Sequence, residues 1–274
     1  MIKTLILYLL PAIFLFAAFY LWPRGKNKNT LGQRPELVGL SFCNFKTFRK
    51  QKLDEFLLEL NSSFDKPKPS FDMSKVKGLD FKSHQDLKKV LGLVAGQYGL
   101  KCPINLTISK DKMSADNGRA SAAAWVYVDQ LSRMDTLEFS TSTVQMFLHE
   151  SQITGESVDV SRIVNIFSHE CAHIVLYASR NKYKESEIMT DMLAIHQGFD
   201  QVYLTVNKLD VSKWQSTAWS LLYSEAGGQL HGASEYASKL EKLYVVMSVQ
   251  HDKFRAQLDM LKSALKMFSE SKST

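Results

Sequence analysis

Apolar residues recur every three or four positions along most of the chain, a spacing that is typical of amphipathic helices. It predicts helices over residues 45–60, over 84–98 with an end at Gly99, and within 158–179. Alternating apolar and polar residues predict short strands between the last two helices, at 104–108, 123–128, 136–139 and 143–148. Beyond Gly198 the helical pattern continues to the end, with a break at Gly227-Gly228. A small sheet followed by helices predicts an α+β fold.

The helix predicted within 158–179 carries the segment His169-Glu170-Cys171-Ala172-His173. Two histidines four residues apart lie one turn apart on the same helix face, where both imidazoles can bind one zinc ion at about 2.0–2.1 Å. Glu170 projects near that face and can act on a zinc-activated water. Cys171 points elsewhere and is predicted to be a core residue. The alternative is a core helix with two hydrogen-bonded histidines.

A second helix is expected to begin near residue 184 or 185, with Ser186 close to its N-cap. Glu187 and Asp191 are four residues apart and therefore share a face. Glu187 is the predicted third zinc ligand, and Asp191 is predicted to accept the ring N–H of a ligating histidine. Gly198 stands where a helix C-cap is expected. The alternative is a solvated acidic face.

These two segments resemble the zinc-binding segments of the gluzincins, which are zincin metallopeptidases with a glutamate ligand. The resemblance covers about residues 90–200. It implies a zincin-like domain with one Zn²⁺ per chain, bound by His169, His173 and Glu187. It also implies that Glu170 is the general base and that Asp191 orients a histidine. The residue that stabilises the tetrahedral intermediate is not assigned, and the candidates are Tyr183, His196, Tyr223 and His231.

Residues 4–22 contain no charged side chain, and this length of helix spans a hydrocarbon core of about 30 Å. The segment predicts a single-pass membrane anchor, and a cleaved signal peptide is the disfavoured alternative because no polar residues follow Ala17-Ala18. Arg24, Lys26 and Lys28 follow the segment, whereas Lys3 and the amino terminus precede it, so positive charge favours a cytoplasmic body by a margin of one charge. A periplasmic or other extracytoplasmic body stays open.

The predicted organisation is a transmembrane anchor at 1–23, a tether at 24–42, a zincin-like domain at 43–200 and a helical extension at 201–274 that packs on it. The apolar content of 45% is typical of a globular body. Three cysteines without CxxC spacing do not indicate a disulfide framework. The net charge is +6, but no nucleic-acid-binding motif accompanies it.

The residues together predict a membrane-anchored, zinc-dependent metallopeptidase that hydrolyses a peptide or protein substrate. The main alternative is a non-catalytic zincin-like module that binds or regulates a partner at the membrane. A different zinc hydrolase with the same ligands is a third reading. The substrate, the cleavage preference, the role of any regulatory partner and the oligomeric state stay open.

Overall fold

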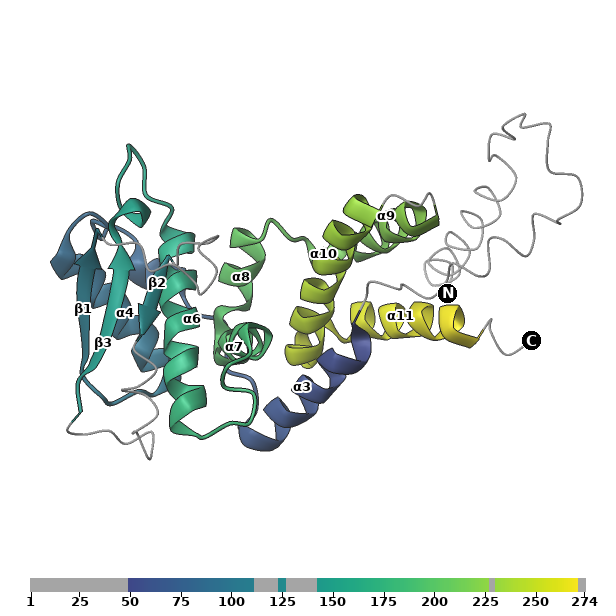
Figure 1. The fold of residues 1–274 in the computed structure, drawn as a ribbon, viewed down its shortest axis with the longest axis horizontal. Helices are drawn as coiled ribbons and strands as arrows, with labels where there is room; N and C mark the ends of the chain where they lie inside the picture. The colour runs from purple at the N-terminus through teal and green to yellow at the C-terminus, as the bar shows by residue number, and fades with distance from the viewer. Residues whose placement is uncertain (1–48, 111–122, 127–141, 227–229, 271–274) are drawn as a thin grey trace, which may run out of the picture. The chain divides into compact units, whose positions relative to one another are not determined.

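Figure 1 shows a computed structural model of the 274-residue chain, which describes residues 49–110, 123–126, 142–226 and 230–270. All of them belong to one compact unit, residues 42–274. The predicted anchor at 4–22 and the predicted strand at 136–139 lie outside the described residues. No helix in the described part of the chain is both long and apolar enough to cross a membrane. The predicted α+β class is confirmed.

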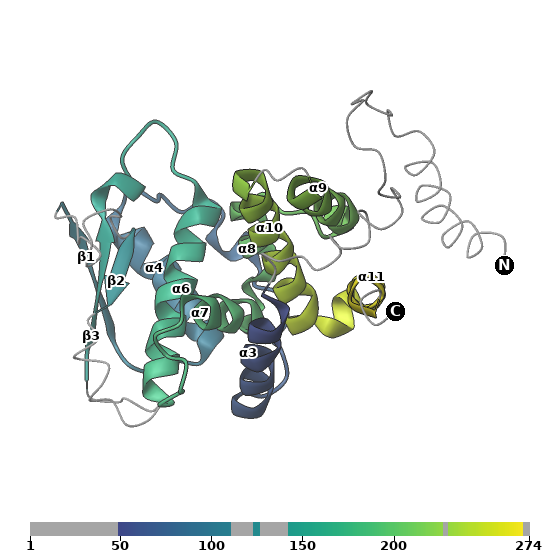
Figure 2. The same ribbon diagram turned by 45° about the vertical axis from the view of Figure 1, so that its right-hand side comes forward.

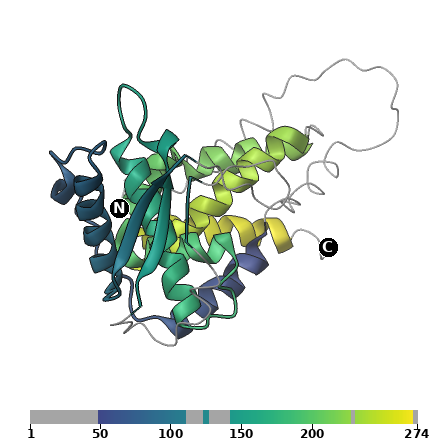
Figure 3. The ribbon, with the colours of Figure 1, turned by 60° about the vertical axis from the view of Figure 1, so that its left-hand side comes forward.

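The described sheet has three strands in the order β1-β3-β2, where β1 is Ile104–Ser109, β2 is Ala124–Val126 and β3 is Val144–His149. Strand β1 is parallel to β3, and β2 is antiparallel to β3 (Figure 3). The register places Leu106 opposite Met146 and Ala124 opposite Leu148, so these buried side chains share one face. Three of the predicted strands are thus confirmed within the described residues.

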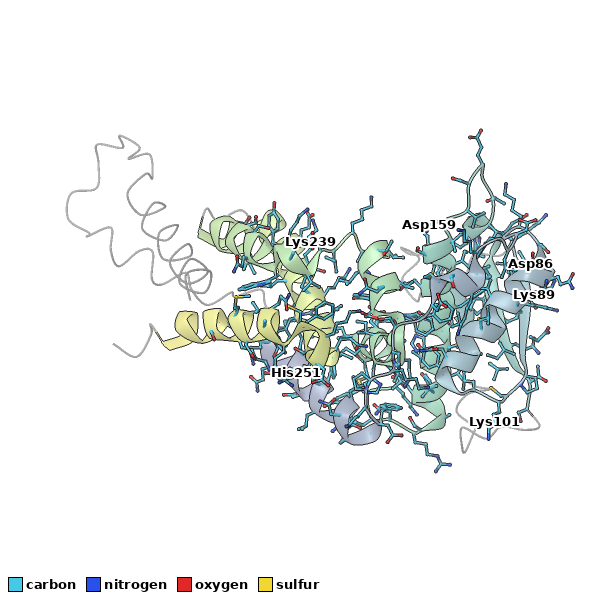
Figure 4. All side chains as sticks on the ribbon, turned by 180° about the vertical axis from the view of Figure 1, so that it is seen from behind. Asp86, Lys89, Lys101, Asp159, Lys239 and His251 are labelled. Atoms are coloured by element: carbon cyan, nitrogen blue, oxygen red, sulfur yellow. The ribbon has the colours of Figure 1, made fainter. Side chains whose placement is uncertain are left out.

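Two helices lie against this sheet, α4 (His84–Tyr98) beside β1 and α6 (Val160–Ala178) beside β2 (Figure 2). Ser83 caps the first turn of α4, and Gly99, with a φ of +75°, ends it as predicted. Asp159 caps α6 by accepting a hydrogen bond from the backbone N–H of Arg162. Figure 4 labels Asp86 and Lys89, which form an ion pair of 2.7 Å on α4. The sequence therefore predicted the two helices that lie against the sheet.

The next helix, α7 (Glu187–Ala194), does not end at a glycine cap. It continues through a π-helical turn, η3 (Ile195–Phe199), into α8 (Asp200–Val206). Gly198 has a φ of +96°, and a Cβ atom there would lie 2.1 Å from the carbonyl oxygen of Pro69. The predicted C-cap is therefore wrong. A close backbone approach requires the glycine, and the N–H of Phe71 donates to the Gly198 carbonyl at 2.7 Å.

The remaining helices form a second layer, in which α10 (Leu230–Val249) packs against α3 (Lys50–Ser63), α9 (Trp214–Ala226) and α11 (His251–Glu270). Short 3₁₀ turns occur at η1 (Met73–Val76), η2 (Glu150–Gln152) and η4 (Val211–Lys213). The predicted start of α3 at residue 45 is too early, because Arg49 precedes the helix with a non-helical ψ of 48°. Contacts of α10 with α7 and η3 join this layer to the sheet-bearing part.

Candidate metal centre

Helix α6 holds both histidines of the motif on one face. The rest of the helix is largely buried against the sheet and neighbouring helices, so the backbone that carries the two rings is held in place. The ring centroids of His169 and His173 lie 4.8 Å apart, with an interplanar angle of 79°. Both residues are only partly buried, so the face remains accessible. Cys171 is fully buried with a free thiol, as predicted for a core residue.

Glu187 reaches the two histidines from the first turn of α7. Ser186 starts this helix by accepting a hydrogen bond from the N–H of Met189. Glu187 Oε2 lies 2.9 Å from His169 Nε2, and Glu187 Oε1 lies 3.8 Å from His173 Nε2. Ligand atoms of a tetrahedral zinc site lie about 3.3 Å apart, which is between these two distances. The nitrogen and oxygen donors are of the types that zinc binds, and one ligand atom of each residue lies within 4.8 Å of the others, so these three residues can hold a metal ion.

The other ring nitrogens contact polar groups that orient the rings. His169 Nδ1 lies 2.9 Å from Asp191 Oδ1, and the hydroxyl of Tyr203 donates to Asp191 Oδ2 at 3.3 Å. His173 Nδ1 lies 3.4 Å from the Thr190 hydroxyl. With Nδ1 engaged in this way, the Nε2 atom of each histidine faces Glu187. The structure thus brings together four of the five residues predicted for zinc binding and catalysis, and adds Thr190 and Tyr203.

The two histidines differ in their electrostatic environment. Burial lowers the pKa of His169, but hydrogen bonds to Asp191 and Glu187 outweigh that effect and raise the pKa to about 10. Burial and the charge on His169 lower the pKa of His173 to about 4. The hydrogen bond from His169 lowers the pKa of Glu187 below its ordinary value. A cation that binds both Nε2 atoms would replace the proton on His169.

Glu170, the fifth predicted residue, is buried beside this cluster and is only 7% exposed. Burial raises the pKa of Glu170 to about 7, with the positive charge on His169 opposing the rise and the charge on Glu187 adding to it. No hydrogen bond from a described residue contributes to the pKa of Glu170. A carboxyl group that titrates near neutral pH can both accept and return a proton.

Of the four candidates for stabilising an intermediate, the two whose side chains the structure describes contact other parts of the molecule. The Tyr183 ring packs edge-on against Phe56 of α3, with centroids 4.7 Å apart. His196 is buried in η3, and its ring lies 6.2 Å from that of Phe64. The side chains of Tyr223 and His231 lie outside the described residues.

Sequence reasoning missed Tyr177, a residue of α6 whose hydroxyl is affected by the charge on Glu187. Burial raises the pKa of its hydroxyl, and the charges on Glu185 and Glu187 raise it further. The ammonium group of Lys184 lies 5.1 Å from the centroid of the Tyr177 ring. Its position four residues after His173, on the same face of α6, is the signal that could have revealed it.

Comparisons of this chain with protein-family models, with curated proteins and with solved structures found no match.

Proposed function

We propose that this protein is a zinc-dependent metallopeptidase with a zincin-like catalytic domain. The observation that carries the proposal is the convergence of His169, His173 and Glu187 from two helices, with ligand atoms all within 4.8 Å of one another. Buried Glu170 lies beside them. Burial of a carboxyl group is unfavourable, so a purely structural cluster gains nothing from Glu170 at this position. A hydrolase does need a general base at that place.

His169, His173 and Glu187 would hold the zinc ion. When bound, zinc supplies Lewis acidity toward water and toward the scissile carbonyl. Glu170 accepts a proton from the attacking water and then donates it to the leaving amine. Asp191 accepts from His169 Nδ1 and so keeps Nε2 directed at the ion, and the Tyr203 hydroxyl holds Asp191 in turn. Three protein ligands leave one coordination position for the substrate.

The uncharged segment 4–22 supports a further part of the proposal, that the catalytic body is tethered to a membrane. The excess of basic residues after this segment favours a cytoplasmic body. The substrate would then be a peptide or protein near the bilayer. A non-catalytic module with the same ligands is the competing function, and Glu170 distinguishes them because a binding module does not require a base.

Zinc content tests the proposal directly. The full-length chain in detergent is compared by elemental analysis with His169→Ala and Glu187→Ala. The matched controls are His251→Ala, on α11, and Glu156→Ala, in an exposed loop. We expect one zinc per chain in the parent and the controls, and none in the two ligand variants. A folded parent that binds no zinc even after reconstitution would refute the proposal in favour of the non-catalytic module.

A further inference from the structure

The segment 179–186 connects α6 to α7 and ends directly before the candidate ligand Glu187. It also contacts the second histidine of the motif, because the His173 ring hydrogen-bonds to the backbone of Lys184. Ser186, the last residue of the segment, is the N-cap of α7. The conformation of this segment therefore helps to set the position of Glu187 relative to His173.

Asn181 is the most deeply buried residue of this segment and is only 5% exposed. Its side-chain Oδ1 accepts a hydrogen bond from the N–H of Tyr183 at 2.9 Å, and its carbonyl accepts from the N–H of Lys184 at 3.2 Å. The carbonyl of Tyr183 in turn accepts from the N–H of Ser186 at 2.8 Å. A series of hydrogen bonds thus runs from Asn181 to the N-cap of α7.

Glu59 of α3 contacts the segment at this buried side chain. Asn181 Nδ2 donates to Glu59 Oε1 at 3.1 Å, and Lys182 Nζ pairs with Glu59 Oε2 at 2.9 Å. The Lys182 side chain is 63% exposed, so its ion pair contributes little. Loss of Glu59 would, however, leave the buried amide of Asn181 without this acceptor, which is costly. The important contact of Glu59 is therefore the one with Asn181.

Helix α3 is itself held in place, so it can support the segment. Its N-terminal end is joined to α10, where the Arg49 guanidinium pairs at 2.7 Å with Glu241, a carboxylate that is only 7% exposed. Further along α3, the Phe56 ring packs edge-on against Tyr183 of the segment. The contacts at Glu59 and Phe56 therefore join the segment to a helix that is anchored on the second layer.

We propose, on the basis of the proposed function, that Glu59 is a positioning residue of the metal centre, which holds the segment 179–186 through Asn181 so that Glu187 lies beside the two histidines. A ligand on a segment that opens is correctly placed in only a fraction of the molecules, and the apparent metal affinity falls by that fraction. Glu59 raises the fraction although it does not contact the ion.

Glu59 could instead contribute only to general stability, like other contacts between the layers. The two roles differ in their effect on zinc affinity. The zinc affinity of a chain that stays folded does not depend on its free energy of unfolding, because the unfolded fraction is negligible. It does depend on the fraction of folded molecules in which the segment is closed.

The test measures the zinc affinity of the full-length chain in detergent by competition with a zinc-chelating dye. Glu59→Ala removes the acceptor of Asn181, whereas Glu59→Gln keeps an acceptor and removes only the charge. The matched control, Glu55→Ala, removes an exposed carboxylate one turn earlier on α3. We expect Glu59→Ala to bind zinc about tenfold more weakly than the parent, as for other groups that support a metal ligand, and the other two variants to stay within about twofold.

Hydrogen exchange in the zinc-free chain measures the opening of the segment directly. The amides of Tyr183, Lys184 and Ser186 hydrogen-bond within it. In Glu59→Ala these amides should exchange about tenfold faster than in the parent, because the open fraction sets their rate. The amide of Gly99, at the end of α4, should keep its parental rate.

Parental zinc affinity in Glu59→Ala, or an equal loss in Glu55→Ala, would overturn the inference. So would an equal loss in Glu59→Gln, since that side chain still offers Asn181 an acceptor. A parent chain that binds no zinc would refute the proposed function, and the exchange rates of the zinc-free variants would then decide on their own whether Glu59 holds the segment.

Discussion

Two buried carboxyl groups in this molecule have pKa values shifted in opposite directions. No hydrogen bond from a described residue contributes to the pKa of Glu170 in α6, and burial raises this pKa to about 7. Asp200 in α8 is fully buried, yet its pKa lies below the ordinary value. Burial would raise the pKa of Asp200 as well, but hydrogen bonds from Lys253, Gln201 and Ser70 outweigh it. Donors, rather than depth, decide whether a buried carboxylate stays ionised.

The difference distinguishes the proposed general base, Glu170, from Asp200, a carboxylate that holds neighbouring segments together. Asp200 Oδ2 accepts from Lys253 Nζ at 2.6 Å, and Oδ1 accepts from the Ser70 hydroxyl at 2.8 Å. These bonds tie α8 to α11 and to the segment that crosses Gly198. A carboxylate held in this way has no capacity for proton transfer. In the proposed peptidase, Glu170 would use that capacity as the general base.

The largest expected effect follows from removing the proton-transfer group. Glu170→Gln keeps the side-chain shape and leaves the three candidate ligands in place, so zinc content should not change. Peptide hydrolysis should fall about 10²- to 10⁴-fold, which is the usual contribution of a general base. A peptidase assay of the zinc-loaded chain, with zinc content measured on the same samples, checks both statements. Hydrolysis that survives the substitution would show that Glu170 is not the base.

Glu170→Gln and Asp200→Asn should also have different effects on the free energy of unfolding. In zinc-free protein at pH 8, Glu170 is ionised and buried, so Glu170→Gln should leave the free energy of unfolding unchanged or raise it. Asp200→Asn should instead lower it by about 2–3 kcal/mol, a value reduced from that of a fully buried ion pair because Lys253 is 41% exposed. Denaturant titration measures both. Asp252→Asn, on the exposed side of α11, is the matched control and should change little.

Acid should remove the contribution of Asp200. Its pKa in the folded protein is below the ordinary 3.8, so the stability it provides is present above that pH and is lost as the pH falls through the lower folded value. The parent should therefore lose more stability than Asp200→Asn below about pH 4. Parallel acid curves for the two proteins would show that the Lys253 and Ser70 contacts do not hold the carboxylate.

Local sequence patterns predicted much of this fold. Periodicity and an end at Gly99 identified α4, and periodicity identified α6. The spacing of His169 and His173, and of Glu187 and Asp191, placed these side chains on shared faces that the structure brings together. Each of these inferences concerns residues within one helix, where the helical backbone determines which side chains share a face.

Features that depend on distant contacts were not predictable in this way. Gly198 matches a helix cap in sequence, but the approach of Pro69, far away in the chain, determines its role. The π-helical turn shifts the register between α7 and α8, so no periodic spacing links Tyr203 to Asp191. A cavity of about 990 Å³ is lined both by α3 and by the segment 182–186, which are separated by more than a hundred residues.

Tyr203 allows the smallest and most specific perturbation of the metal centre. Its hydroxyl donates to Asp191 Oδ2 at 3.3 Å, and burial together with the charge on Asp191 raises its pKa, so it stays a protonated donor. Tyr203→Phe removes one long hydrogen bond from the group that orients His169, and zinc affinity should fall about two- to fivefold. Competition with a zinc-chelating dye measures the change, with Tyr236→Phe on α10 as the control. An unchanged affinity would mean that Asp191 orients His169 without Tyr203, and the charge on the carboxylate alone would then be sufficient.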